Sequence, residues 1–274
     1  MTGRAELSAD QYRAIADYLE RQVGIRLGLG KEYLVVSRLA GLLREHGLAD
    51  FDGLLRELRL GGRAALQAAV VDAMTTNETF WFRDPAHYQI LIDVLMRELP
   101  PGPVRIWSAA ASTGQEPYSI AFALHDARDA GSITADRSWE ILGTDISSSA
   151  LSQAEAGRYC GISAGRGLTT EQRQRFFDAD GDCIQVQPRY RRGVRFRHFN
   201  LLSSFEGLGR FDVIFCRNVL IYFSQERKRD ILKRFHRALS PQGGLFLGST
   251  ESMSDHADLF RMQRHSTGLV YRKI

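Results

Sequence analysis

The first 75 residues alternate apolar and polar positions with the period of short amphipathic helices. Ser8 and Gln11 have capping-box spacing at the start of the first helix. A second helix is expected over Lys31–His46, a third after Asp50, and a fourth up to the end of the segment. The pattern therefore predicts a small all-helical N-terminal domain over residues 1–75.

A linker region, residues 76–99, carries one further helix at Tyr88–Leu99, and the Pro-Pro-Gly-Pro sequence at 100–103 ends it. Beyond it, short apolar runs alternate with helical patterns, which is typical of a parallel sheet. The expected strands and helices are, in order, Val104–Trp107, Gln115–Arg128, Trp139–Gly143, Phe211–Phe215, Gln225–Leu239 and Leu245–Gly248. The last segments, between residues 259 and 271, predict an antiparallel hairpin at one edge. The pattern favours an α/β domain over residues 100–274.

The connection between the second and third of these strands, residues 158–199, is too long for a simple crossover. It holds a short helix at Thr170–Phe177 and two alternating segments, Cys183–Gln187 and Val194–His198. A short turn is expected near residues 180–182. We expect this connection to form a small inserted antiparallel β subdomain, in which the two alternating segments make a hairpin.

Composition narrows the class of protein. No run approaches the ~18 apolar residues of a membrane span, and Met1–Asp10 lacks the apolar stretch of a signal peptide. A cytoplasmic protein that is not inserted in a membrane is therefore expected. Cys160, Cys183 and Cys216 show no C-x-x-C spacing and no nearby histidine cluster, so we expect buried thiols, without a disulfide or a metal site.

The net charge of +4 is unevenly distributed. Residues 1–76 hold ten basic and ten acidic side chains, whereas residues 158–199 hold nine arginines against four acidic residues. Five of these arginines fall in the expected hairpin: Arg189, Arg191, Arg192, Arg195 and Arg197. Such uncompensated charge should steer an acidic partner at low salt. Lys31 and Arg38 share one face of the second helix and could meet the same partner, although a solvated face is the simpler interpretation.

A loop of small residues follows the first predicted strand, within the segment Ile106–Ser119. Ligands of open parallel sheets bind outside the carboxyl ends of the strands, so this loop is the expected position of a nucleotide-like cofactor. Tight turns also require small residues for structural reasons alone. The loop lacks G-x-G-x-x-G and the lysine of a phosphate-binding loop, which argues against NAD, FAD or ATP.

Polar residues follow other strands at the same sheet edge. Asp145 ends the second strand, where it can accept both hydroxyls of a ribose or cap the next helix. Asn200 follows the insertion and Asn218 follows the third strand. Their amides can bind a cofactor, or they can form turns with the local backbone.

Four motifs, Thr75–Arg83, Ser112–Ser119, Gly143–Asp145 and Phe215–Phe223, occur in an order that resembles the CheR-type chemoreceptor glutamate methyltransferases. The resemblance covers nearly the whole chain. It implies a Rossmann-like class I methyltransferase sheet that uses S-adenosylmethionine without a metal and releases S-adenosylhomocysteine. It also implies methyl transfer to glutamate carboxylates on the cytoplasmic helices of bacterial chemoreceptors, giving methyl esters in chemotaxis adaptation.

The resemblance also implies which residues form the site. Carried over position by position, the cofactor shell is Asn77, Thr79, Arg83, Glu116, Asp145, Asn200, Leu201, Asn218 and Val219. Arg83 and Tyr222 lie near the reacting centre. A glutamate, with an ordinary pKa of about 4.3, is already an anion at neutral pH, so we expect these two residues to align it rather than to deprotonate it. The alternatives are an ion pair of Arg83 with Asp84 or Glu78, and a half-buried ring for Tyr222.

The chain departs from the family pattern at Gln115 and Ala111, where a Glu and a Cys are often found. The short turn in the insertion leaves open whether a receptor tail is gripped there. A nucleic-acid methyltransferase is a rival interpretation, but an Asn-Pro-Pro-Tyr motif is absent and the aromatic residues are not interleaved with the basic ones. A sensor that only binds the cofactor would not need both Arg83 and Tyr222.

Overall fold

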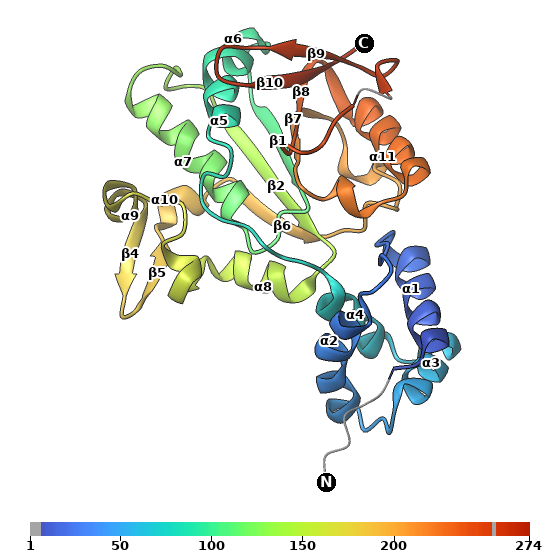
Figure 1. The fold of residues 1–274 in the computed structure, drawn as a ribbon. Helices are drawn as coiled ribbons and strands as arrows, with labels where there is room; N and C mark the ends of the chain where they lie inside the picture. Colours follow the sequence, from blue (N-terminus) through green and yellow to red (C-terminus); the bar gives the residue numbers. More distant parts are fainter. Residues whose placement is uncertain (1–6, 254–255) are drawn as a thin grey trace.

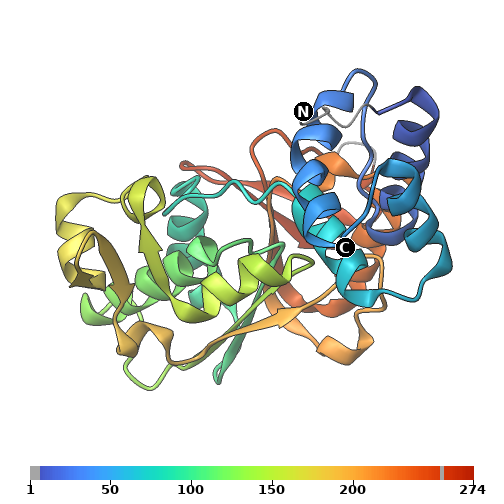
Figure 2. The same cartoon turned by 90° about the horizontal axis from the view of Figure 1, so that it is seen from below.

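The computed structural model describes residues 7–253 and 256–274. A helical N-terminal domain and a small β subdomain lie at opposite ends of a central α/β domain (Figures 1 and 2). The expectation that Met1–Asp10 holds no signal peptide falls mostly outside the described residues. Within the described part of the chain, no helix is long and apolar enough to cross a membrane.

The helical domain forms as predicted. Its helices are α1 (Ala9–Val23), α2 (Glu32–Glu45), α3 (Phe51–Leu60) and α4 (Ala64–Met74). Ser8 and Gln11 make the predicted capping box at α1. The apolar faces meet in one core, in which Leu19, Leu39 and Leu54 are fully buried, each such burial contributing roughly 1.5–3 kcal/mol.

The linking helix is also confirmed, with one irregularity. It consists of α5 (Ala86–Ile90), a π-helical turn η1 (Leu91–Leu95) and α6 (Met96–Glu98). Leu91 and Leu95 of the π turn are fully buried in the core of the large domain. This helix therefore packs on the sheet as part of its covering layer.

The central sheet has seven strands in the order β6-β2-β1-β7-β8-β10-β9. The strands are β1 (Val104–Ala109), β2 (Trp139–Asp145), β6 (Val194–His198), β7 (Phe211–Cys216), β8 (Leu239–Leu247), β9 (Phe260–Arg264) and β10 (Leu269–Lys273). The strands from β6 to β8 are parallel, while β10 is antiparallel to β8 and β9. The predicted parallel sheet with an antiparallel hairpin at one edge is confirmed.

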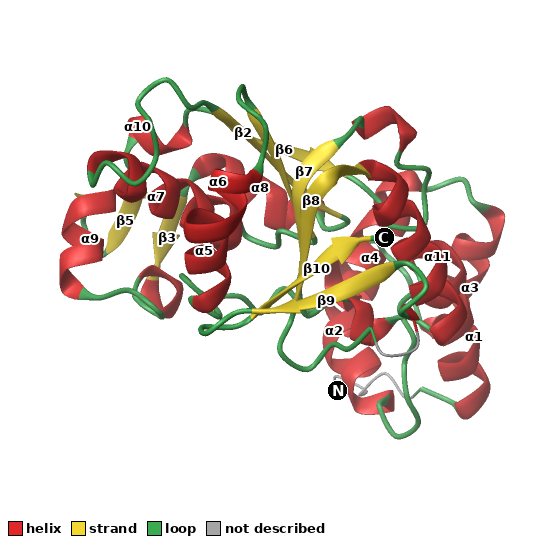
Figure 3. Ribbon diagram, turned by 90° about the horizontal axis from the view of Figure 1, so that it is seen from above, coloured by secondary structure: helices red, strands yellow, loops and turns green. Residues whose placement is uncertain are grey.

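Helices cover both faces of this sheet (Figure 3). Ile106 of β1 faces a core that includes α7 (Gln115–Asp129), whereas its neighbour Trp107 faces α11 (Gln225–Ala238). The Trp107 ring lies 5.1 Å from the ring of Phe235 on α11. Because successive residues of a strand point to opposite faces, β1 is apolar on both sides, as a central strand of a doubly wound sheet must be.

The inserted subdomain differs from the prediction in one respect. Its three-stranded sheet pairs β5 (Cys183–Val186) with β3 (Arg158–Cys160) and β4 (Phe177–Asp180), and the short turn at residues 180–182 is confirmed. However, β6 pairs in parallel with β2 of the main sheet, so the hairpin expected between Cys183–Gln187 and Val194–His198 is wrong. Alternation along a strand does not reveal its partner.

The packing of β6 explains its position. The Phe196 ring lies against Gly143 of β2, where an added Cβ would come within 2.7 Å of the ring. It also meets the Tyr118 ring of α7 at 5.6 Å. The arginines expected on one hairpin are consequently divided, with Arg189 and Arg191 on α10 (Pro188–Arg191) and the last two on β6.

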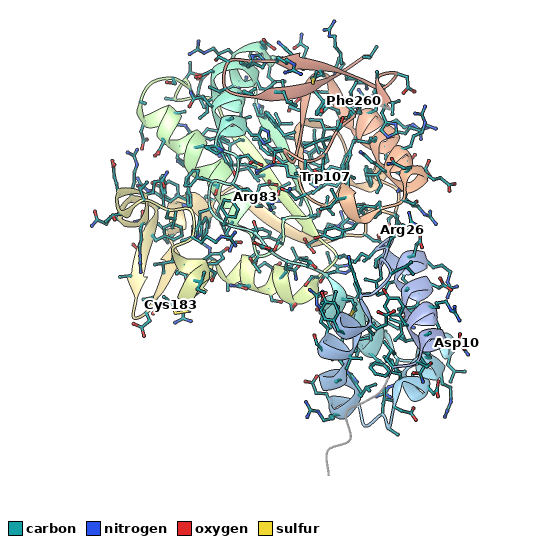
Figure 4. All side chains as sticks on the ribbon, viewed as in Figure 1. Asp10, Arg26, Arg83, Trp107, Cys183 and Phe260 are labelled. Atoms are coloured by element: carbon teal, nitrogen blue, oxygen red, sulfur yellow. A yellow bond between two sulfur atoms is a disulfide. The ribbon has the colours of Figure 1, made fainter. Side chains whose placement is uncertain are left out.

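The cysteines also depart from the prediction. Cys160 and Cys183 face each other across β3 and β5 and form a disulfide, so the expectation of three free thiols is wrong. Cys216 alone is a buried free thiol among the described residues. The prediction rested on an odd number of cysteines without C-x-x-C spacing, and the sequence does not reveal that two residues 23 positions apart meet across paired strands. Figure 4 shows Cys183 at the outer end of the subdomain, away from the ends of the main strands.

Candidate functional site

A cavity of about 1250 Å³, counting its open mouth, lies between the helical domain and the carboxyl ends of β1, β2 and β7. All the predicted site residues line it: Asn77, Thr79, Arg83, Glu116, Asp145, Asn200, Leu201, Asn218, Val219 and Tyr222. Val23, Leu27 and Leu34 of the helical domain line it as well. Figure 4 shows Arg83 at the sheet and Arg26, another lining residue, on the helical domain. Both domains therefore enclose the candidate site.

Asp145 is buried at the end of β2. Its two carboxylate oxygens accept hydrogen bonds from the backbone N–H groups of Ser112 (2.8 Å) and Ser147 (2.9 Å). The N-cap of α8 (Ser148–Ala156) is Ser147, so the helix-cap interpretation of Asp145 is wrong. Burial raises the pKa of Asp145, although its backbone hydrogen bonds oppose the shift. Each oxygen keeps a lone pair that can accept a further hydrogen bond.

The small-residue loop after β1 has an unusual backbone. Ala110 and Ser112 have φ values of 61° and 52°, in the left-handed region that side chains disfavour. The Ser112 hydroxyl donates to the carbonyl of Asn77 at 2.8 Å, and the Asn77 amide donates to the Ser147 hydroxyl at 3.3 Å. These bonds hold the loop against the Thr75–Arg83 motif, and strained backbone of this kind often occurs at ligand sites.

The Thr75–Arg83 motif is fixed from outside the cavity. The Trp81 backbone N–H donates to the carbonyl of Arg166 at 3.1 Å, and its indole N–H donates to the carbonyl of Ser163 at 3.0 Å. The next residue, Phe82, donates its N–H to the Ser119 hydroxyl at 3.0 Å. The motif is therefore anchored to both the insertion and α7 immediately before Arg83.

Arg83 has neither of the ion-pair partners considered from the sequence. Glu78 pairs with Arg166 at 2.9 Å, and Asp84 pairs with Arg217 at 2.6 Å. Among the described residues, the Arg83 guanidinium makes no ion pair and lies 5.5 Å from the Phe80 ring. A cation that lines a cavity without a counterion can bind an anion that enters it.

Tyr222 ends a 3₁₀ turn, η4 (Leu220–Tyr222), and its half-buried side chain lines the cavity. Its carbonyl accepts a hydrogen bond from the N–H of Arg26 at 3.0 Å. Within residues 7–253 and 256–274, the phenol hydroxyl has no hydrogen-bond partner. The α1–α2 connection therefore fixes the backbone of Tyr222 and leaves its hydroxyl available.

The two asparagines play different structural parts. The Asn200 side chain accepts from the N–H of Leu202 at 2.9 Å and donates to the carbonyl of Gln22 at 2.8 Å, so it forms a local turn and ties the two domains together. Asn218 has a φ of 58°, and its buried side-chain oxygen has no partner among the described residues. An unpartnered buried acceptor is rare and fits a ligand donor.

Glu116 belongs to an ion network whose centre, Arg217, was missed from the sequence. The Arg217 side chain is only 2% exposed and donates to Glu116 at 2.8 Å, to Asp84 at 2.6 Å and to the carbonyl of Arg83 at 2.6 Å. Burial lowers the pKa of Arg217, but Glu116, Tyr88 and Asp84 together outweigh burial and hold the pKa above its usual value. The signal available was an arginine within an otherwise apolar motif, next to Asn218.

The two cationic residues of the second helix that were expected to meet a partner, Lys31 and Arg38, differ in their surroundings. Lys31 is exposed and lines the cavity. Arg38 instead donates to the carbonyls of Met74 and Thr75, both at 2.9 Å, and so holds the end of α4. These bonds give Arg38 a structural role, and a docking role for Lys31 and Arg38 stays a prediction.

Two protein-family models match this chain. The model for the CheR methyltransferase SAM-binding domain matches residues 77–269, and the model for the CheR methyltransferase all-alpha domain matches residues 10–75.

Individual relatives match over nearly their full length. A chemotaxis protein methyltransferase of Vibrio parahaemolyticus is 44% identical over 97% of this chain and 98% of its own. Chemotaxis protein methyltransferase 1 of Pseudomonas aeruginosa is 45% identical over 93% and 94%, and the Escherichia coli chemotaxis protein methyltransferase is 38% identical over 93% and 88%. A solved TehB-like SAM-dependent methyltransferase of Corynebacterium glutamicum is 13% identical, with a TM-score of 0.40 over 69% of this chain and 100% of its own.

Proposed function

Since the chain belongs to the CheR methyltransferase family, we propose that it transfers methyl from S-adenosylmethionine to glutamate side chains of bacterial chemoreceptors, giving methyl esters in chemotaxis adaptation. One observation carries the choice of acceptor. Arg83, a cation without an ion pair among the described residues, lines the same cavity as the Tyr222 hydroxyl. This pair suits an anionic carboxylate, which needs alignment and no general base.

The donor set of the cavity fits S-adenosylmethionine. The Asp145 carboxylate has two free lone pairs for ribose hydroxyls. The unpartnered Asn218 oxygen can accept from the cofactor's amino group, and Ala110 and Ala111 leave room for close approach. We propose that these residues act with the rest of the predicted shell, namely Asn77, Thr79, Arg83, Glu116, Asn200, Leu201 and Val219. When bound, the cofactor supplies an electrophilic methyl group on a positively charged sulfur.

Arg83 and Tyr222 are proposed to place the acceptor. The planar guanidinium can hold a carboxylate through two parallel hydrogen bonds. The phenol can donate one further hydrogen bond to the carboxylate. A lone pair on a carboxylate oxygen then stays free to attack the methyl group. Alignment of this kind supplies up to roughly 7–11 kcal/mol in favourable intramolecular reactions. The helical domain lines one side of the cavity. We propose that a bound acceptor displaces water there, which assists a reaction in which opposite charges neutralise each other.

The proposed partners are cytoplasmic receptor helices. The positive surface charge of this protein supports a partner with an acidic surface. Lys31 lies at the cavity, while Arg192, Arg195 and Arg197 are exposed and make no ion pair among the described residues. Such charges raise association rates at low salt more than they raise affinity. A cytoplasmic location is part of this proposal.

The Asp145→Asn variant tests the cofactor site. We expect its dissociation constant for S-adenosylmethionine to rise about 10- to 100-fold, because bonds to a charged acceptor contribute about 1.5–3 kcal/mol. Calorimetric titration measures this. Asp72→Asn is the matched control, since Asp72 accepts from Ser148 and Ser149 at the same helix end without lining the cavity. Unchanged affinity in Asp145→Asn would contradict the assignment.

The same site predicts a pH dependence. Only the ionised carboxylate accepts from both ribose hydroxyls, and burial raises the pKa of Asp145 above the ordinary value of 3.8. The affinity for S-adenosylmethionine is therefore expected to be highest at pH values above the raised pKa. On acidification it should fall at a higher pH than that at which an ordinary aspartate becomes protonated. Titrations of wild type and Asp145→Asn across the acidic range measure this, and parallel pH profiles would contradict it.

The acceptor class is tested by supplying methyl-tritiated S-adenosylmethionine with receptor-containing membranes, with DNA, and without an acceptor. Label is expected only in the protein of the receptor membranes. Label in DNA would favour the nucleic-acid interpretation. Cofactor binding without any transfer would favour a sensor.

A further inference from the structure

Glu251, which was not among the residues selected from the sequence, has a buried carboxylate surrounded by backbone donors. One oxygen accepts from the N–H groups of Asn218 and Gly248, both at 2.8 Å. The other accepts from Val219 at 3.0 Å and Leu220 at 2.8 Å. Consecutive backbone N–H groups that converge in this way form a nest for an anion. Glu251 fills that nest from within the chain.

The turn that forms the nest contains a residue in the left-handed region. Asn218 is left-handed with a φ of 58°, a conformation that most residues other than glycine disfavour and that asparagine tolerates better than they do. Its amide also packs on Gly248, where an added Cβ would lie 2.7 Å from the amide nitrogen. Glu251 is itself fixed, since its N–H donates to the Gly248 carbonyl at 2.9 Å. The bonds from Glu251 thus hold the conformation of Asn218.

This turn carries three side chains of the candidate site. Asn218 and Val219 line the cavity, and Tyr222 follows at the end of η4. The N–H of Tyr222 donates to the Val219 carbonyl at 3.1 Å, so the position of η4 depends on the turn. Glu251 does not line the cavity and reaches the site only through the backbone.

We propose that Glu251 is a positioning residue, whose carboxylate sets the Asn218–Leu220 turn and thereby aims Asn218 at the cofactor and Tyr222 at the acceptor. The inference rests on the proposed function for the roles of Asn218 and Tyr222. The geometry of the nest does not depend on that function.

The test compares Glu251→Gln with Asp212→Asn. The glutamine amide presents N–H donors to backbone N–H groups, so at least two hydrogen bonds are lost. Asp212 is the matched control, because it accepts from the Arg105 N–H and the Ser240 hydroxyl, both at 2.9 Å, at the other end of β7. Each protein is measured for cofactor affinity, kcat, the KM for the acceptor, and amide hydrogen exchange at residues 218–220.

Glu251→Gln is expected to weaken cofactor binding and lower kcat, each about tenfold or more, with the acceptor KM little changed. Its amides at residues 218–220 should exchange faster. Asp212→Asn should lose stability, while its cofactor affinity, kcat, acceptor KM and amide exchange at residues 218–220 stay at wild-type values. Wild-type affinity and exchange in Glu251→Gln, or equal losses in Asp212→Asn, would overturn the proposal. If Glu251→Gln does not fold, Gly248→Ala displaces the same turn. It should likewise weaken cofactor binding and lower kcat, with the acceptor KM little changed.

Formate provides a second test. In Glu251→Ala the nest is left without its anion, so added formate should restore part of the cofactor affinity. It should not restore affinity in Asp145→Asn. Absence of rescue would contradict the role of a carboxylate in the nest. Affinity and exchange are measured without an acceptor, so they decide the role of Glu251 even if wild type transfers no methyl.

Discussion

Arg83→Ala is expected to lower the rate of methyl transfer about 100-fold or more, because misplacing a reacting group by about 1 Å costs that much. Tyr222→Phe, which loses one hydrogen bond, should lower it about tenfold. Both variants retain Asp145, so we expect cofactor affinity to fall far less than the transfer rate. Single-turnover transfer and calorimetric binding, measured on the same preparations, separate the two effects.

Arg166→Ala is the matched control for Arg83. Both guanidinium groups lie over the Phe80 ring, at 4.7 Å for Arg166 and 5.5 Å for Arg83, but only Arg83 lines the cavity. Arg166→Ala should therefore transfer methyl at close to the wild-type rate. Wild-type rates in Arg83→Ala and Tyr222→Phe together would remove the basis for acceptor alignment.

Arg217→Met should lower the free energy of unfolding by about 3–5 kcal/mol, which is typical when one partner of a buried ion pair is removed. The methionine fills similar volume but leaves Glu116 and Asp84 without their cation. It also releases the Arg83 carbonyl, so the folded fraction should transfer methyl more slowly. Urea unfolding measures the first effect, and transfer per folded molecule measures the second.

Arg272→Met controls for the loss of a buried arginine far from the cavity. Arg272 pairs with Glu98 and donates to the carbonyl of Gln242 at 2.8 Å, outside the cavity lining. It should destabilise the fold and leave transfer per folded molecule unchanged. If both variants lost stability and activity equally, Arg217 would have no specific connection to the site.

The elements that the sequence predicts well are those specified by local periodicity. The amphipathic pattern before residue 75 and the capping box at Ser8 depend only on neighbouring residues, and the helices appear where expected. The apolar runs at β1 and β7 similarly report burial on both sheet faces. The π turn inside the linking helix left no comparable signal, since its apolar pattern is that of an ordinary helix.

The features that were missed depend on contacts between distant residues. The strand β6 alternates as a hairpin strand would, and only its packing on Gly143 shows that it joins the main sheet. The Cys160–Cys183 disulfide, the Arg217 network and the Glu251 nest likewise join residues from different elements. For the candidate site, the family resemblance selected residues that all line the cavity, whereas the further lining residues and the groups that hold the site required the structure.

The chemical identity of the methylated bond tests the central claim most directly. Receptor labelled by this protein with methyl-tritiated S-adenosylmethionine is treated with mild base, and volatile methanol is measured. A glutamate methyl ester is expected to release the label as methanol, and labelled peptides should carry the methyl on glutamate. Label that stays on the protein through base treatment, as methyl bound to nitrogen would, contradicts the account.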